Sequence, residues 1–489
     1  MNILHLSGGL STLTPLIYHS ETDKSTVFRA DFADITILSI KCLITVVLID
    51  KRIKRGYNRT IMKKYALING KLLDGSENMT VREDMVVLVD GERIADVVSK
   101  NDFRPDGREV IDLGGKYLMP GLINMHVHLA GNGKPQKKQR DNAKLVKKIT
   151  STALTRAIAY KLVAKFAEIE LLSGVTTIRT VGGLADFDTK LRDDIDKGKK
   201  TGPRILAANR GISVSGGHMA GSVAVAADSA EDALKILKNN EAEGVDLVKL
   251  MITGGVLDAK ERGVPGEVKM PAETIKAVCA EAEKDGYVVA AHVESPEGVK
   301  IALKNGVGSI EHGAKPDDEI VRLFKETGAY LCTTISPALP YALFDRSVSG
   351  ISEVEQFNGN VVFEGVIDCA KAAVKNGIPV VLGNDVGCPW ITQYDFWREL
   401  CYFQKYVGVS NAFAIYTATK RSAELAGIGE ETGSIERGKC ADMIVLSGNP
   451  LDDLSVLRKI DAVIARGKIF KNPKVKRNAK VDRELDKYL

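Results

Sequence analysis

Between Lys116 and about residue 427, short apolar segments alternate with amphipathic ones, and this alternation limits the possible folds more than any other feature. Eight apolar segments read as strands, with helical patterns such as 153–172 and 272–285 between most of them. Strands that alternate with helices predict βαβ units, and eight units in roughly 310 residues fit an α/β fold of the closed (β/α)8 TIM-barrel type. The strand candidates are 117–128, 175–181, 203–209, 246–253, 288–294, 308–312, 329–335 and 379–384.

Both flanks of this region read as β structure. Strands separated by Gly, Asn and Asp turns are expected near 65–68, 85–89 and 93–98, and again within 433–446 and 462–466. The flanks can therefore pair into one small β-sandwich domain, whereas the basic tail is expected to be frayed. The predicted organisation is an atypical extension at 1–61, an N-terminal sandwich segment at 62–115, the barrel at 116–427, a C-terminal sandwich segment at 428–475 and a basic tail at 476–489.

Residues 1–61 lack this rhythm of strands and helices. The apolar run from Ile35 to Ile49 contains Lys41 and is short for a membrane span. It also starts too late for a standard signal peptide and lacks a small-residue cleavage site. We interpret the segment as the product of a start codon assigned too far upstream, with Met62 as the real start. A membrane anchor or targeting segment and a genuine soluble extension are the alternatives.

The composition is ordinary for a globular chain, with 44% hydrophobic and 27% charged residues. It excludes a mainly disordered chain, a collagen-like fibre and a polytopic membrane protein. A net charge of +5 over 489 residues gives no support to a nucleic-acid partner. The seven cysteines are odd in number and never spaced as CxxC, which argues against a disulfide scaffold or a zinc ribbon. Reduced thiols and a cytoplasmic location are therefore expected.

Histidines gather at the carboxyl ends of the predicted strands, where barrel enzymes place their active sites. His126 and His128 end the first barrel strand, and residues i and i+2 of a strand point to one face. His292 and His312 end the fifth and sixth strands. Each alone would more often be a structural histidine. Together they offer four neutral nitrogens around one opening, a donor set that suits zinc and related metals.

Two further polar residues end or occupy strands of the same region. Asp385 ends the eighth strand, where it can bind a metal and accept a proton from water. Lys249 lies within the fourth strand among Leu, Val and Met. A buried lysine does not stay charged cheaply, so it either pairs with an acid or is neutral and chemically modified.

These motifs resemble the amidohydrolase superfamily, on the imidazolonepropionase-related branch that includes Xaa-Pro dipeptidase-like amide hydrolases. The resemblance runs from about Lys63 to about Lys471. It rests on segments that are specific in combination: PGLINMHVH, GVTTIRTVGG, GPRILAANRGIS, VKLMITGGV, AAHVES, IEHG, LGNDVG and GSIERGKCADMIVL.

The resemblance implies two divalent metal ions, most simply Zn²⁺, and a barrel with a flanking β-sandwich. His126, His128 and Asp385 would bind one ion, and His292 and His312 would bind the other. Lys249 would be carboxylated by CO₂ and bridge the two ions as a carbamate. The chain departs from the family pattern at Asn124, Asn384 and the pair Arg179-Thr180, none of which is a metal ligand.

A mechanism follows from this metal site. Two ions would share a water and lower its pKa, and the hydroxide would attack a carbonyl carbon. Asp385 would take the water proton and deliver it to the leaving nitrogen. His218, after the third strand, either donates to the developing oxyanion, holds substrate, or only caps a turn.

The substrate is expected to be a small molecule, with dipeptides or N-acyl amino acids favoured. Lys134–Lys148 is rich in Lys and Arg and either attracts a carboxylate or forms a solvated face, and 254–270 is a candidate lid. Alternative activities are a mononuclear cyclic amidine or imidazolone hydrolase or deaminase, and a lactone or ester hydrolase. A non-enzymatic scaffold is disfavoured because all six expected ligands are present. Neither nucleic acid nor membrane is expected as a partner, and the resemblance implies a homo-oligomer.

Overall fold

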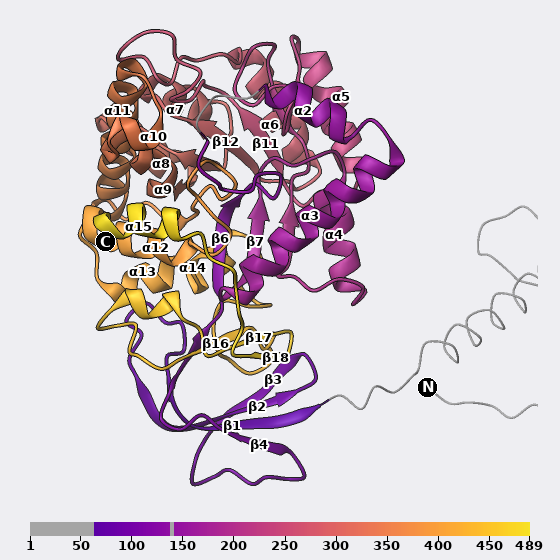
Figure 1. Ribbon diagram of the computed structural model, residues 1–489, viewed down its shortest axis with the longest axis vertical. Helices are drawn as coiled ribbons and strands as arrows, with labels where there is room; N and C mark the ends of the chain where they lie inside the picture. The colour runs from indigo at the N-terminus through magenta and orange to yellow at the C-terminus, as the bar shows by residue number, and fades with distance from the viewer. Residues whose placement is uncertain (1–62, 137–140) are drawn as a thin grey trace, which may run out of the picture. The chain divides into compact units, whose positions relative to one another are not determined.

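Parallel strands form the centre of the molecule in the computed structural model, which describes residues 63–136 and 141–489 (Figure 1). The expected extension at 1–61 and some residues of the basic segment 134–148 lie outside the described residues. One parallel sheet has the order β6-β7-β8, and a second has the order β10-β9-β11-β12-β13-β14-β15. Their bounds are β6 (Leu122–Val127), β7 (Val175–Thr180), β8 (Arg204–Ala207), β9 (Gly211–Ser213), β10 (Ala224–Ala226), β11 (Val248–Met251), β12 (Val289–Val293), β13 (Ser309–His312), β14 (Tyr330–Thr333) and β15 (Val380–Leu382).

Each of the eight predicted barrel segments contains one of these strands. The first segment is divided, because Tyr117–Pro120 (β5) joins the flanking sheet and only β6 joins the parallel strands. The short strands β9 and β10 were not predicted, and they follow β8 within the long connection to β11. The α/β class with parallel strands is therefore confirmed.

Helices follow most of the strands and cover their outer side (Figure 1). Helix α3 begins with a capping box in which Thr152 and Thr155 satisfy each other's backbone amides, and α11 begins with the same device at Ser352 and Glu355. The helices are α2 (Asn142–Ile149), α3 (Ala153–Leu172), α4 (Phe187–Asp196), α5 (Ala230–Ala242), α6 (Ala272–Lys284), α7 (Pro296–Lys304), α8 (Asp318–Thr327), α9 (Ile335–Leu343), α10 (Arg346–Ser349), α11 (Glu353–Lys375), α12 (Phe396–Tyr402), α13 (Asn411–Thr417) and α14 (Lys420–Leu425).

Backbone hydrogen bonds join both edge strands of the three-stranded sheet to the larger parallel sheet. Beyond β15, the amide of Asp385 donates to the carbonyl of His126 at 3.0 Å, and His128 donates to Val386 at 3.0 Å. At the other edge of the three-stranded sheet, the amide of Asp246, which precedes β11, donates to the carbonyl of Ala207 on β8 at 2.8 Å. The first pair of bonds brings the end of β15 beside the end of β6.

The two flanks of the chain share one sheet, as the sequence predicts. Its order is β18-β17-β16-β5-β1-β2-β3, with β4 paired to β1, and a buried apolar cluster that includes Leu67, Val87 and Met443 lies against it. Because β16 pairs antiparallel with β5, the C-terminal flank is tied to the segment that leads into β6. The strands are β1 (Lys64–Leu72), β2 (Arg82–Asp90), β3 (Arg93–Ser99), β4 (Glu109–Asp112), β5, β16 (Met443–Leu446), β17 (Ala462–Ala465) and β18 (Lys468–Lys471).

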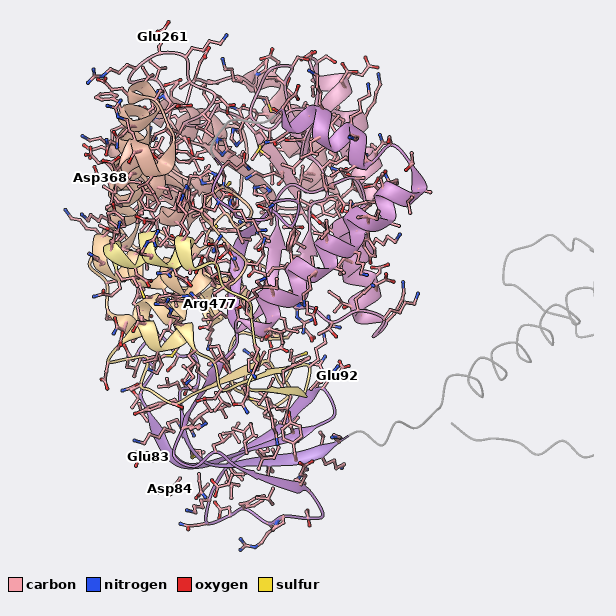
Figure 2. The ribbon with its side chains drawn as sticks, in the orientation of Figure 1. Glu83, Asp84, Glu92, Glu261, Asp368 and Arg477 are labelled. Carbon is pink, nitrogen blue, oxygen red and sulfur yellow. The ribbon has the colours of Figure 1, made fainter. Side chains whose placement is uncertain are left out.

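The C-terminal tail is not frayed, contrary to the expectation from its composition. Residues Ala479–Leu485 form helix α15, whose Val481 and Leu485 are buried. Arg398 on α12 is almost fully buried and pairs with Asp482 at 3.0 Å and with Asp486. Figure 2 labels Arg477 beside this helix, where its guanidinium binds Asp482. Ion pairs and apolar contacts therefore stabilise a segment that reads as solvated in the sequence.

Candidate metal centre

Strand β6 presents the two histidines of the HxH motif through an irregular register. Its pairing with β7 shifts between Asn124 and Val127. Within the shifted segment, Met125 packs with Tyr330 and Cys332, whereas Val127 belongs to the larger apolar cluster that includes the helices. The shift lets His126 and His128 both turn toward Asp385, whose Oδ1 lies 3.6 Å from His126 Nε2 and 3.3 Å from His128 Nε2.

Two more of the expected ligands, His312 and Asp385, have a left-handed backbone conformation. His312 has φ 68° and Asp385 has φ 54°, both at the ends of their strands. This region is unfavourable for residues with a Cβ, and such conformations collect at functional sites. Gly383 makes the close approach possible, because a Cβ there would lie 2.3 Å from the Cβ of His126.

The rings of the four strand-end histidines meet in one buried cluster. The centroids of His126 and His312 are 4.8 Å apart, and those of His292 and His312 are 4.6 Å apart. His128 lies 5.3 Å from His126. Ligand atoms of His126, His312 and Asp385 lie within 4.8 Å of one another, and so do those of His292, Glu294 and His312.

Each ring has one nitrogen occupied by a protein oxygen, which determines the nitrogen that remains. Nδ1 of His126 faces Glu311 Oε2 at 2.7 Å, and Nδ1 of His128 faces the carbonyl of Gly182 at 2.8 Å. Nδ1 of His312 faces Thr334 Oγ1 at 2.6 Å. These bonds leave Nε2 of all three histidines available to a cation, and the Nε2 atoms of His126 and His128 face Asp385.

His292 is held differently. Its Nε2 lies 3.3 Å from the carbonyl of Gly254, which leaves Nδ1 as the free nitrogen. Every ligand histidine thus offers one lone pair to the cluster, provided that the ring is neutral.

The environment favours neutral rings. Burial lowers the pKa of His126, His292 and His312 well below the usual value, and it lowers the pKa of His128 as well. Neutral imidazole is the form that binds a metal. The donor set also includes an unmatched acceptor, because Asp385 Oδ1 is buried and no group among residues 63–136 and 141–489 donates a hydrogen bond to it. A set of neutral nitrogens with one orphaned carboxylate oxygen fits a divalent cation.

Lys249 lies on β11 and is almost completely buried. Burial lowers the pKa of its amine to about 8, against the opposing influence of Glu311 and Asp385. Within the described ranges no acid lies at ion-pair distance from this amine. The lowered pKa makes the neutral, modifiable form of this amine more accessible than in an ordinary lysine, and no salt bridge within the described residues holds it in the charged form.

His218 lies at the edge of the cluster. Its ring stacks on that of His292, with centroids 4.0 Å apart and an interplanar angle of 5°. Nδ1 lies 2.5 Å from Asp258 Oδ2, and this carboxylate also accepts a hydrogen bond from the amide of Gly255. Burial opposes ionisation of Asp258, but the contact with His218 lowers the pKa of the carboxyl. The ring of His218 is thus held against the ring of His292, an expected metal ligand, and a residue that only capped a turn would not need this contact.

Four polar residues of the site were not singled out as site residues from the sequence. Glu311 contacts His126, Thr334 contacts His312, and Asp258 contacts His218. Glu294 has a buried Oε2 without a hydrogen-bond partner in the described chain, and burial followed by repulsion from Asp385 raises its pKa to about 8. The sequence could have identified Glu311 as a site residue, because an acid within a buried apolar strand must have a partner.

Two departures from the family pattern are coupled to each other. The side-chain amide of Asn124 donates to Asn384 Oδ1 at 2.8 Å, and the backbone amide of Asn384 donates to Asn124 Oδ1 at 3.2 Å. The two residues therefore join the base of the HxH motif to the strand end that carries Asp385.

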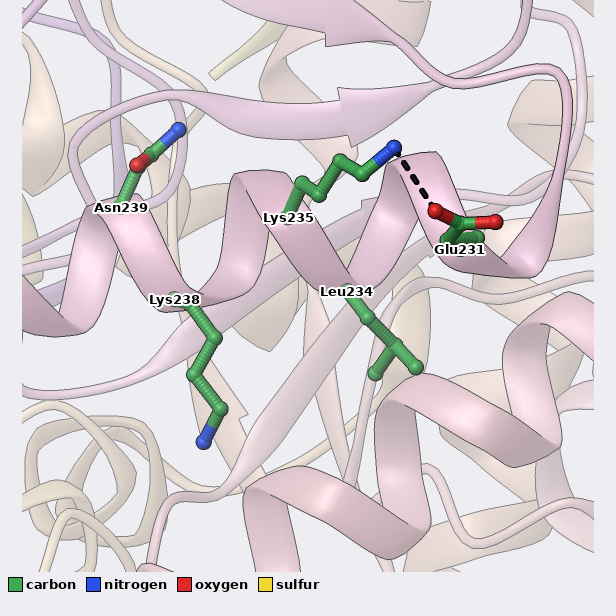
Figure 3. A pocket seen from close by; sticks show the side chains of 5 residues that line it. All are labelled: Glu231, Leu234, Lys235, Lys238 and Asn239. Atoms are coloured by element: carbon green, nitrogen blue, oxygen red, sulfur yellow. Dashed lines mark ion pairs between the residues drawn. The ribbon is translucent and has the colours of Figure 1, made fainter.

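A separate surface pocket lies along helix α5 (Figure 3). An ion pair of 2.9 Å joins Lys235 and Glu231 at its edge. None of the cluster residues lines it, so the pocket does not contribute to the metal centre. Its lining residues are Glu231, Leu234, Lys235, Lys238 and Asn239.

Comparison with known proteins gives matches over most of the chain. A model of the Amidohydrolase family matches residues 117–470. The crystal structure of a candidate prolidase from Bifidobacterium longum is 35% identical, with a TM-score of 0.77, and the match covers 87% of this chain and 99% of that chain. A Xaa-Pro dipeptidase with methionine bound in its active site is 31% identical, with a TM-score of 0.73 and coverage of 84% and 100%. Ochratoxinase of Aspergillus niger is 25% identical over 386 residues, which cover 73% of this chain and 76% of the relative.

Proposed function

Because this chain belongs to the amidohydrolase family and is a hydrolase of carbon–nitrogen bonds, we propose that it cleaves the amide bond of dipeptides or N-acyl amino acids. The observation that carries this proposal is the convergence of four neutral histidines and Asp385 beside the buried Lys249. A Xaa-Pro dipeptidase and a candidate prolidase are among the proteins most similar to the whole chain, which favours short peptides.

Two divalent cations, most simply Zn²⁺, are the cofactors that this donor set would hold. His126, His128 and Asp385 would bind one ion and His292 and His312 the other, with Lys249 between them. The neutral amine of Lys249 would add to CO₂ and release a proton, which gives an anionic carbamate that can bridge two cations. When bound, such ions supply Lewis acidity that polarises a carbonyl group and favours deprotonation of water.

Asp385 is the proposed proton carrier. Its Oδ1 is buried and has no donor within the described residues, so it is available to accept a proton. It would take this proton from the attacking water and deliver it to the nitrogen of the leaving amine. The proton thus leaves water and ends on the amine, while the hydroxyl adds to the acyl carbon.

His218 is proposed to bind the oxygen that becomes negative during the attack. Its Nδ1–H donates to Asp258, which orients the ring and leaves Nε2 for the substrate. A pre-oriented donor stabilises charge that develops in the transition state. The alternative role, holding a substrate carboxylate, uses the same nitrogen.

We further infer that the parallel strands form one closed (β/α)8 barrel with a β-sandwich beside it. The hydrogen bonds between Asp385 and His126 and between Asp246 and Ala207, which join both edge strands of the three-stranded sheet to the larger sheet, support closure. The domain limits proposed from the sequence are the barrel at 116–427 and the sandwich at 62–115 and 428–475, whereas strand β5 of the flanking sheet ends at Pro120.

A cytoplasmic, homo-oligomeric protein remains our proposal. The six cysteines within the described residues are all free thiols. No helix in residues 63–136 and 141–489 combines the length and apolar character that crossing a bilayer requires. Exposed Leu154, Ile158 and Leu162 form an apolar stripe on α3 that a second copy would cover. Analytical ultracentrifugation of the full chain would give the number of copies.

Turnover of a mixed library tests the proposed activity. Zinc-loaded protein prepared with bicarbonate would be incubated with dipeptides, N-acyl amino acids and cyclic ureides, and products would be identified by mass spectrometry. The Asp385→Asn variant serves as the blank. Cleavage of dipeptides or N-acyl amino acids by the wild type alone supports the proposal. Cleavage confined to the cyclic ureides would refute it.

A further inference from the structure

An ion pair buried behind the metal centre connects two strands that lie in different parallel sheets. Arg179 on β7 donates from Nη2 to both carboxylate oxygens of Glu311 on β13, at 2.7 and 2.9 Å. The side chain of Arg179 is 3% exposed and that of Glu311 is 0% exposed. Such a bidentate pair has a defined orientation as well as a strong attraction.

The guanidinium of Arg179 is fully engaged. Nε donates to the carbonyl of Met125 at 2.7 Å, and Nη1 donates to Tyr330 Oη at 2.8 Å and to Ser309 Oγ at 3.2 Å. Burial disfavours its charge, but the facing Glu311 carboxylate raises the pKa of Arg179 above its ordinary value. These hydrogen bonds hold the guanidinium and the carboxylate in one geometry.

The carboxylate of Glu311 also faces a metal ligand. Its Oε2, which accepts from Arg179, lies 2.7 Å from Nδ1 of His126. Both oxygens of Glu311 already accept hydrogen bonds from Arg179, so the contact with His126 places the proton on Nδ1 and the lone pair on Nε2. This is the nitrogen that points toward Asp385 Oδ1 at 3.6 Å.

His126 is unlike the other ligand histidines in this respect. Nδ1 of His128 faces a backbone carbonyl and that of His312 faces the hydroxyl of Thr334, both of them neutral. Among the described residues, a carboxylate contacts the second nitrogen of a ligand histidine only at His126. A charged acceptor fixes the tautomer more firmly and makes the ring a stronger electron donor.

A contribution to folding stability does not by itself explain why the protein contains such a buried ion pair. Burying two charges costs about as much free energy as their attraction returns, and apolar residues often replace such pairs without loss. Its contact with His126 gives the pair a role that apolar residues of the same volume lack.

We propose that Glu311 and Arg179 are positioning residues for the metal centre. Arg179 holds the carboxylate of Glu311, and Glu311 holds His126 in the tautomer and orientation that offer Nε2 to the cation. This inference rests on the proposed metal-dependent function, and it adds a dependence of metal affinity on two residues that do not touch the metal.

The test measures zinc affinity, so that it does not depend on activity. Zinc-loaded full-length protein would be titrated with a competing chelator for the wild type and for Glu311→Gln. We expect the variant to bind the more weakly held zinc about 10- to 100-fold less tightly. The visible spectrum of the cobalt-loaded protein should also change, because it reports the ligand field at the metal. Wild-type affinity and an unchanged cobalt spectrum in a folded Glu311→Gln variant would overturn the proposal.

A double-mutant cycle tests whether Arg179 acts on His126 through Glu311, an arrangement that we call the relay. If Arg179 acts through Glu311, Arg179→Met weakens zinc binding in the wild-type background but has no further effect in Glu311→Gln. Additive losses in the double variant would show that Arg179 acts independently and would refute the relay.

Two further variants separate positioning from general destabilisation. Asp395→Asn removes a buried partner of Arg398 at 3.1 Å on α12 and is expected to lower stability without changing zinc affinity. If Glu311→Gln does not fold, Arg179→Lys keeps the charge but loses the bidentate geometry, and it should still weaken zinc binding. Wild-type zinc affinity in Arg179→Lys would then contradict the proposal. A wild type that binds no zinc would instead refute the metal-dependent function itself.

Discussion

The ring of His218 stacks on the ring of His292, with centroids 4.0 Å apart and planes 5° from parallel. His218 follows β9 and His292 lies on β12, so the stack joins a loop to a strand that carries a proposed metal ligand. A loop histidine is thereby fixed at the edge of the site, with Asp258 holding its outer nitrogen.

The His218→Ala substitution should lower kcat about 10²- to 10³-fold, the usual effect of losing one oxyanion donor. Asp258→Asn should lower kcat less, because the donor remains but loses its orientation. If Asp258 acts through His218, the double variant should match His218→Ala alone in steady-state kinetics. Unchanged kcat in His218→Ala, with two metals bound, would exclude a catalytic role for this residue.

The Asp385→Asn substitution should leave a folded protein that has lost most of its turnover. Loss of a proton carrier lowers the rate about 10²- to 10⁴-fold. Steady-state kinetics and metal analysis of the purified variant would be measured together. Turnover like that of the wild type would rule out the proton-carrier role, whereas lost activity together with lost metal would assign Asp385 chiefly to metal binding.

Lys249→Ala should remove the bridge between the two cations. We expect fewer than two metals per chain by elemental analysis and strongly reduced activity, because the two cations then repel each other without an anion between them. Short carboxylic acids such as acetate should restore some of the activity by occupying the place of the carbamate. A variant that keeps two metals and the full rate would contradict the carbamate.

Removal of metal should lower stability as well as activity. A ligand that binds only the folded state adds about 4 kcal/mol at roughly 1,000 times its Kd. Chelation should therefore lower the thermal midpoint, and readdition of Zn²⁺ should restore both the midpoint and turnover. Calorimetry before and after chelation makes the comparison, and an unchanged midpoint would indicate that the cluster binds no metal tightly.

Deletion of residues 479–489 should destabilise the protein although the segment reads as a solvated tail. The deletion removes Asp482 and Asp486, which face the buried guanidinium of Arg398. Leaving a buried charge without its partners costs about 3 to 5 kcal/mol. Urea unfolding would measure the loss. Arg483→Ala is a suitable control, because this side chain is 70% exposed and its removal should change stability by less than about 0.5 kcal/mol.

The expectation of a frayed C-terminal tail was wrong because the contacts that hold the tail were not visible in its composition. Composition reports the average polarity of residues 471–489, but a few apolar and acidic positions decide whether such a segment packs. Val481 and Leu485 are buried, and the acids of the segment meet a buried arginine from α12. That arginine lies 84 positions away from Asp482, beyond the reach of any local pattern.

Local patterns in the chain were enough to predict the succession of the parallel strands and the position of four histidines and Asp385 at their ends. Both follow from short-range rules, namely the alternation of apolar and amphipathic segments and the two-residue repeat of a strand. These rules also predicted that the flanking segments form strands, which the structure joins in one sheet.

Contacts between distant strands determine which of these side chains meet and through which atoms. The register shift in β6, the positive φ of His312 and Asp385, and the bond between Arg179 and Glu311 all depend on such pairing. A local pattern predicts on which face of a strand or helix a side chain lies. The packing of the other strands decides where that face bends and which partner a buried charge finds, because an unpaired charge inside the protein is too costly to remain.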